Sequence, residues 1–206
     1  MKRALLVIPF LSLGSLPAVD FTPMLTVKKV ERFSIPVLTF AAVEDRISYK
    51  PPFKWQSAGS PEALTLRPPA PSTGTMKLLS LRWSPERTAK LGTAESEQKW
   101  ALEFLPTEAD EPEVTGKFES PFTLGPYTSP ESIISYQIDG VPQKISVSRC
   151  DISAVERIVV LISSEAESFE TFRQDGMSSL FSWEWLGASS QMAAAIASPI
   201  SRVPTR

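Results

Sequence analysis

Apolar and polar residues alternate along much of the chain after residue 26, which is typical of half-buried β-strands. Between residues 33 and 49 the apolar positions recur on one face, and they predict one long bent strand or two strands broken near Ala41. Pro36 has no backbone donor, which favours an edge strand or a bulge at that point. The same alternation predicts further strands over residues 79–83 and 181–185.

The clearest local signal is a hairpin. Asp139 and Gly140 separate two alternating runs, 134–138 and 145–147, and this dipeptide favours a two-residue turn between antiparallel strands. Residues 158–162 form a continuous apolar run, which predicts a central strand buried on both faces.

Helices are predicted to be few and short. Ser84 followed by Pro85 is typical of a helix start, with Gly92 as the stop. Residues 100–104 fit either a strand or a helix. A capping box at residues 164–167 predicts the best helix of the chain, with Phe169 and Phe172 facing inward and Gly176 at its end.

Two stretches are predicted to be loops. Residues 50–75 are crowded with proline, and we expect a long loop or extended excursion there, containing one short strand at Leu64 and Leu66. Residues 103–119 hold six acidic residues and one lysine without the order of a calcium loop, so we expect a solvated acidic loop.

Together these elements predict a mainly β fold, an antiparallel β-sandwich or barrel of about eight strands with one or two short helices. The predicted organisation is an extended N-terminal arm over residues 1–25, a β-sandwich domain over 26–188 that carries the loop 50–75, and a short helix with a C-terminal tail over 189–206.

The first eighteen residues allow two interpretations. A basic start at Lys2 and Arg3 followed by an apolar run is similar to an export signal. Pro9 and Gly14 interrupt the run, which favours an ordered arm that lies on its own core or on a neighbouring subunit. The run is too short and too interrupted for a membrane span.

Composition excludes several kinds of chemistry. The 206 residues include no histidine and one cysteine, Cys150, which rules out serine–histidine triads, cysteine–histidine pairs and the usual zinc sites. No phosphate-binding glycine loop is present. We therefore expect no enzyme, no cofactor and no metal site, and we expect Cys150 to be a small buried apolar residue.

Neither the net charge nor the carboxylates indicate a binding or catalytic site. The net charge of −2 shows no basic surplus, so nucleic acid is not expected as the principal partner. Glu103, Glu184 and Asp139 are the carboxylates in or beside predicted strands. Because they alternate with apolar positions, they are expected on a solvent face rather than in a paired-acid site.

The aromatic residues divide into two groups. The tryptophans at 83, 100, 183 and 185 share the parity of apolar neighbours and are expected in the core. Phe53 and Trp55 lie off any clear strand and are candidates for an exposed contact. With the apolar residues of the arm they make up the candidate assembly contacts: Phe10, Leu11, Leu13, Leu16, Phe21, Phe53 and Trp55.

These features predict a non-catalytic structural subunit of a large assembly, in particular a phage or virus particle component such as a tail-tube, tail-adaptor or capsid-decorating protein located in the virion. Its partners would be copies of itself and other subunits of the assembly. The alternative is a secreted, periplasmic or cell-surface binding module, one that stacks aromatic side chains on carbohydrate.

Overall fold

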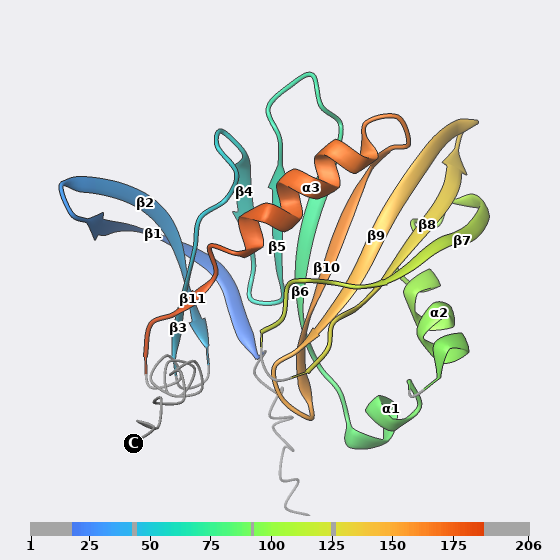
Figure 1. Ribbon diagram of the computed structural model, residues 1–206, viewed down its shortest axis with the longest axis horizontal. Helices are drawn as coiled ribbons and strands as arrows, with labels where there is room; N and C mark the ends of the chain where they lie inside the picture. The colour runs from blue at the N-terminus through green and yellow to red at the C-terminus, as the bar shows by residue number, and fades with distance from the viewer. Residues whose placement is uncertain (1–17, 43–44, 92, 125–126, 188–206) are drawn as a thin grey trace, which may run out of the picture.

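The computed structural model describes residues 18–42, 45–91, 93–124 and 127–187, and it is built from two antiparallel sheets and three short helices (Figure 1). The four-stranded sheet has the spatial order β1 (Val19–Val30), β2 (Phe33–Ala42), β3 (Arg46–Tyr49), β11 (Glu184–Trp185). The seven-stranded sheet has the order β4 (Gln56–Gly59), β5 (Ala63–Arg67), β6 (Thr75–Arg82), β10 (Glu156–Glu165), β9 (Val141–Asp151), β8 (Pro130–Ile138), β7 (Asp110–Glu119). The predicted antiparallel, mainly β architecture is confirmed. It is sandwich-like, and the described strands close no barrel.

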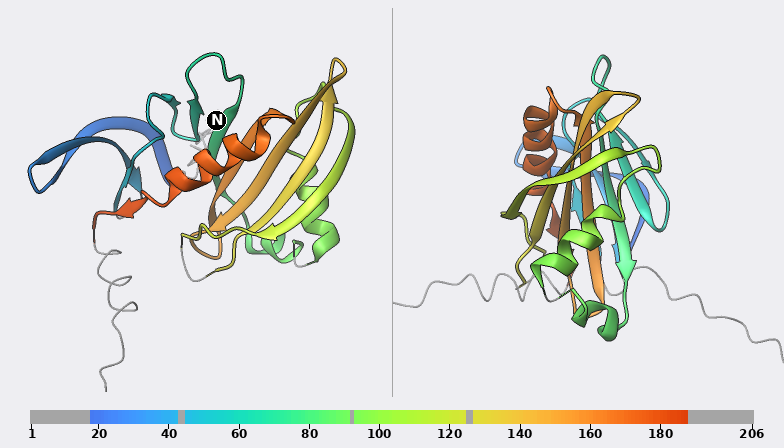
Figure 2. Two further views of the ribbon diagram at one scale, coloured as in Figure 1. Left: turned by 45° about the horizontal axis from the view of Figure 1, so that its top comes forward. Right: turned by 90° about the vertical axis from the view of Figure 1, so that its right-hand side faces the viewer.

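The two longer helices lie on opposite sides of the seven-stranded sheet (Figure 2). α3 (Phe169–Leu180) covers one face, and α2 (Ala94–Leu102) lies against part of the other. α1 (Pro85–Ala89) lies at the lower end of the molecule in Figure 1. Ser84 caps α1 through its side chain, as predicted. Residues 100–104 begin in a helix, because Thr93 and Ser96 form a capping box that starts α2 upstream of them.

β10 is the central strand that the apolar run predicted. Ile158, Val160 and Ile162 face the core beneath α3, whereas Val159 and Leu161 face the core beneath α2. The sheet therefore separates two apolar cores. Trp83 and Trp100 lie in the second core, as expected, and Trp183 and Trp185 are partly buried against the first.

The hairpin prediction is confirmed at Asp139 and Gly140. These residues join β8 to β9 with φ angles of 50° and 75°, the left-handed pair that a tight two-residue turn requires.

Both predicted loops contain strands. Within residues 50–75, β5 is the short strand predicted at Leu64 and Leu66, both fully buried, and it pairs with a second strand, β4. Within residues 103–119, β7 pairs with β8. An edge strand needs only backbone hydrogen bonds and can carry polar side chains on both faces, so its sequence shows no apolar alternation.

The end of α3 differs from the prediction. Gly176 lies inside the helix, and Ser164 belongs to β10. A Cβ atom at Gly176 would lie 3.1 Å from Ile162 and 3.2 Å from Met76, so glycine allows close packing of α3 on the sheet rather than ending the helix.

The described end of the predicted N-terminal arm, residues 18–25, lies mostly in β1 and begins in the core of its own chain. Val19 and Phe21 are fully buried, and the Val19 amide donates to Ser80 Oγ at 2.9 Å. Residues 1–17 and 188–206, including the helix expected near 192–197, lie outside the described residues. None of the helices in the described ranges is long and apolar enough to cross a bilayer.

Candidate functional site

The hairpin formed by β1 and β2 projects from the body of the molecule (Figure 1, left). Its outer half carries exposed apolar side chains, with Leu25 75% and Phe33 71% exposed. The full set is Met24, Leu25, Val27, Val30 and Phe33. By the strand register, Leu25 and Val27 lie on one face of the ribbon, and Met24, Val30 and Phe33 lie on the other. Exposed apolar groups gathered on one element of a soluble protein indicate a contact surface.

The register of the hairpin explains why these residues are apolar. Leu25 lies opposite Leu38 and Val27 lies opposite Pro36, so these pairs share a face with the core residue Phe40. That face begins in the core and continues past its edge into solvent. A two-stranded ribbon without a covering layer is only marginally stable in water, so a partner would stabilise it.

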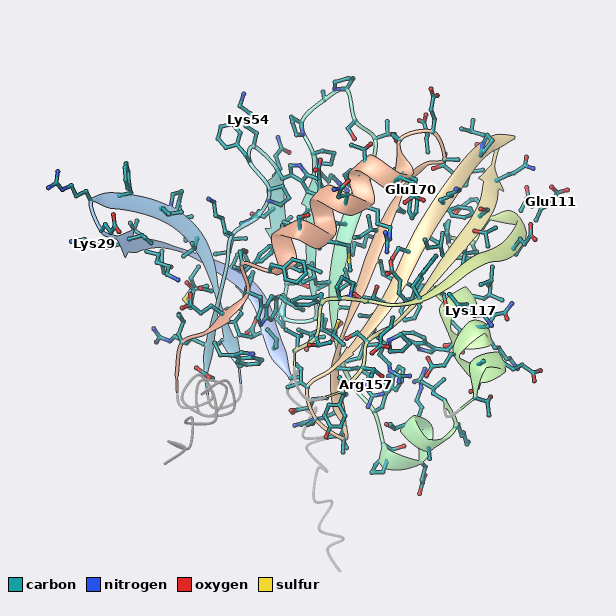
Figure 3. The ribbon with its side chains drawn as sticks, viewed as in Figure 1. Lys29, Lys54, Glu111, Lys117, Arg157 and Glu170 are labelled. Carbon is teal, nitrogen blue, oxygen red and sulfur yellow. The ribbon has the colours of Figure 1, made fainter. Side chains whose placement is uncertain are left out.

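The tip of the hairpin is basic. Lys28, Lys29 and Arg32 are accompanied by one acidic residue, Glu31. Lys28 forms an ion pair with Glu184 of β11. Among the described residues, Lys29 and Arg32 have no ion-pair partner, and Figure 3 shows Lys29 at the outer end of the hairpin.

The opposite end of the molecule is acidic. β7 carries four acidic residues and one lysine, and Figure 3 places Glu111 at the end far from Lys29. Exposed Phe118, 55% accessible, adds an apolar group to this edge. Pro112 and two register shifts interrupt the backbone ladder of β7, so this edge offers side chains rather than a row of free backbone groups.

The predicted contact residues do not form one surface. Phe21 is fully buried in the core of its own chain, because it lies on the inward face at the root of β1. Phe53 is 87% exposed, whereas Trp55 is partly buried and stacks on Phe172 with ring centres 4.8 Å apart. Phe10, Leu11, Leu13 and Leu16 lie outside the described residues.

Sequence reasoning missed the outer hairpin. The apolar alternation of residues 33–43 predicts a half-buried strand but does not show where the core ends, and its first positions are exposed. A usable signal was present: Lys28 and Lys29 precede a short charged turn that apolar alternation flanks on both sides. Such a run is typical of a projecting hairpin with a charged tip.

Two buried charge clusters serve the fold. Arg173 of α3 donates from Nε and Nη2 to the buried carboxylate of Glu131, each at 2.7 Å. These hydrogen bonds raise the pKa of Arg173, and they hold α3 against β8.

The second cluster joins α2 to the sheet. Arg149 contacts Glu97 at 2.5 Å and Asp151 at 3.3 Å, and Arg157 contacts Asp151 at 3.6 Å. Burial raises the pKa of Glu97 and lowers that of Arg157. Since Glu97 and Asp151 both have arginine partners, the cluster resembles a structural ion-pair network rather than a free acid and base.

The carboxylates considered from the sequence lie on three separate elements. Glu184 pairs with Lys28, Glu103 lies 3.6 Å from Arg87, and Asp139 is in the β8–β9 turn. In the part of the chain that the structure describes, no three histidine, cysteine, aspartate or glutamate residues are grouped to hold a metal ion. Cys150 is fully buried, as predicted, and burial raises its pKa to about 12.

No family model and no curated protein matches this chain. Among solved structures, PA94, a protein of unknown function from Pseudomonas aeruginosa, aligns over 88% of this chain and 99% of its own, with 10% identity and a TM-score of 0.38. LpqN, involved in cell envelope biogenesis of Mycobacterium tuberculosis, aligns over 83% of this chain and 84% of its own, with 12% identity and a TM-score of 0.32. Similarity at this level carries no functional conclusion.

Proposed function

We propose that this chain is a non-catalytic subunit of a multi-copy assembly, in which the projecting hairpin of one copy contacts the acidic β7 edge of the next. The observation that carries the proposal is the exposure of Leu25, Val27 and Phe33, which lie on the hairpin beyond the root where β1 contacts β4 and β6. Burying these side chains against a neighbour would stabilise both the hairpin and the contact.

Charge complementarity supports the choice of partner surface. Lys29 and Arg32 at the hairpin tip match Glu111 and Glu113 on β7. Exposed ion pairs add little affinity each, but they fix the orientation of two surfaces and suppress wrong contacts. Phe118 on the acidic edge supplies an apolar surface for the hairpin.

The placement of the two surfaces determines the kind of assembly. They lie at opposite ends of the molecule, so the contact is head-to-tail, and repeated contacts of this kind produce a ring or a filament (Figure 3). Tubes and shells of phage or virus particles are assemblies built this way, and we propose such a particle as the setting of this subunit.

The proposal is tested by charge reversal and complementation. We expect light scattering to show an average mass that rises with protein concentration and falls with added salt. The double variant Lys29→Glu, Arg32→Glu is expected to stay monomeric, and so is Glu111→Lys, Glu113→Lys. Mixing the two variants is expected to restore alternating assemblies, because both contacts between unlike copies pair opposite charges: the native hairpin with the native β7 edge, and the reversed hairpin with the reversed edge.

Lys54→Glu is the matched control, because Lys54 is a lysine of the loop between β3 and β4 that belongs to neither surface. It is expected to associate like the wild type. A wild-type chain that remains monomeric at millimolar concentration, or a mixture of the two variants that remains monomeric, would contradict the proposal.

The alternative of a secreted carbohydrate-binding module receives less support from the described surface. Such a module needs a flat platform of exposed aromatic rings. Trp83 and Trp100 are buried, and Trp55 is stacked on Phe172 within its own chain. Mass spectrometry of the native product distinguishes the two, since export would leave a chain beginning near Val19.

A further inference from the structure

A cavity of about 370 Å³ opens on the face of the seven-stranded sheet that also carries α2. Its floor is made by side chains of the central strands, and one wall is the segment that follows α2, including Leu105. The volume lies at the small end of the range for ligand sites in proteins.

One part of the cavity lining is cationic and rich in hydroxyl groups. Arg67 of β5 and Lys77 of β6 line it together with Thr75 and Ser163. The register brings these residues together, because Lys77 lies beside Leu161 and Thr75 lies beside Ser163 on the neighbouring strand. Neither cation forms an ion pair with any residue that the structure describes.

Among the described residues, no aspartate or glutamate lines the cavity. Glu165, at the end of β10, accepts a hydrogen bond from Thr73 Oγ1 at 3.2 Å and does not line the cavity. The positive charge of Arg67 and Lys77 is therefore available to a bound group.

The rest of the lining is apolar. Leu161 and Ile145 contribute aliphatic groups from the floor, and Leu105 and Tyr136 contribute from the side of α2. All four side chains belong to the core cluster beneath α2 or pack against it, so this wall is held in place by the fold.

We infer that this cavity binds a small amphipathic anion, a carboxylate or phosphate monoester with a short apolar chain. The anionic group would lie between Arg67 and Lys77 and accept a hydrogen bond from the Thr75 hydroxyl. The Ser163 hydroxyl donates to the Thr75 carbonyl at 3.4 Å and would have to turn from it to reach the anion. The apolar chain would pack on buried Leu161 and cover the part of Leu105 that is exposed to water. The inference is independent of the proposed assembly, because neither the hairpin nor β7 lines the cavity.

The test uses octanoate and octyl phosphate as anionic probes and octanol as the neutral probe of equal chain length. Calorimetry is expected to show saturable octanoate binding, about tenfold tighter than octanol at low salt. Amide resonances of β6 and β10 around Thr75 and Ser163 are expected to shift with octanoate, while those of the β1–β2 hairpin stay unchanged.

Charge-neutral variants locate the anionic group. Arg67→Gln and Lys77→Gln are each expected to weaken octanoate binding about threefold, and the double variant about tenfold. Octanol binding should not change in any of them. Lys99→Gln, on the exposed surface of α2, is the matched control and is expected to bind octanoate like the wild type.

Three outcomes would overturn the inference: equal affinity for octanoate and octanol, octanoate shifts confined to another surface, or wild-type affinity in the double variant. If octyl phosphate binds and octanoate does not, the site is specific for phosphate, and the inference stands in that narrower form. Because all these variants change exposed side chains, circular dichroism should confirm that each is folded.

Discussion

The guanidinium of Arg157 packs on the indole ring of Trp83 at 4.0 Å from its centre and is completely buried. Arg87 lies 4.8 Å from the same ring, yet its side chain is 56% exposed. One tryptophan therefore contacts one arginine inside the protein and another at its surface. The pair allows a cation–π contact with a buried guanidinium to be compared with one at the surface.

Arg157→Ala is expected to lower the free energy of unfolding by about 3 kcal/mol or more, because it leaves a cavity beside Trp83 and removes a partner of the partly buried Asp151. Arg87→Ala should cost less than about 1 kcal/mol. Urea denaturation of both variants measures the difference. Equal costs would show that burial of Arg157 does not determine its contribution.

Gly59→Ala is expected to destabilise the root of the projecting hairpin. A Cβ atom there would lie 2.1 Å from the carbonyl oxygen of Phe21 and 2.7 Å from Cδ of Pro23, so the backbone of β1 must move. We expect a loss of about 1–3 kcal/mol in urea denaturation. Amide resonances from Val19 to Phe21 should shift most, and an unperturbed β1 would contradict the close approach.

Gly140→Val tests the tight turn between β8 and β9. The φ angle of +75° is unfavourable for a β-branched residue, and no atom lies within 4 Å of the position of a Cβ. We therefore expect the free energy of unfolding to fall by at least about 1–2 kcal/mol, because of backbone strain and not because of a steric clash of the side chain. Gly140→Asn, which tolerates positive φ, should lose less. Equal thermal stability of all three proteins would refute the turn assignment.

Cys150 is expected to make stability fall at alkaline pH. Its pKa rises from 9.0 to about 12 through burial, so above pH 9 the unfolded thiol ionises while the folded thiol stays protonated. Folded protein then binds more protons than unfolded protein, and rising pH favours unfolding. Between pH 8 and pH 10 the wild type should lose about 1 kcal/mol more than Cys150→Ala in urea denaturation with reductant present.

An independent measurement of the same residue is alkylation by iodoacetamide at pH 8. The native thiol is expected to react only through unfolding, and denaturant should accelerate the reaction strongly. Rapid labelling of the native chain, or identical pH profiles for the wild type and Cys150→Ala, would contradict the burial of this thiol.

The sequence predicted local structure correctly where a single residue determines the backbone conformation. Gly140 specifies its turn and Ser84 specifies its helix start, so both were placed correctly. The apolar run of residues 158–162 identified the central strand because only a position between two cores requires apolar groups on both faces.

Features that depend on tertiary context were not predictable in the same way. β7 is a strand only because β8 offers it a backbone ladder, and its own side chains show no period. Glycine often ends a helix, but Gly176 lies inside α3 and allows the helix to pack closely on Ile162 and Met76. The sequence does not reveal that contact. Leu25 and Val27 have the pattern of core residues, and only the length of the hairpin places them outside the core.

The pairing of β10 with β6 has a consequence for how the chain folds. Val159 lies beside Leu79, and the segment between them includes two helices and three strands. The middle of the sheet therefore cannot close on the ribosome until β10 has left the exit tunnel, and until then β6 presents an unpaired edge. During synthesis the edge of β6 should therefore stay exposed for a long time. A chaperone or a slow translation rate would then determine the yield of native protein.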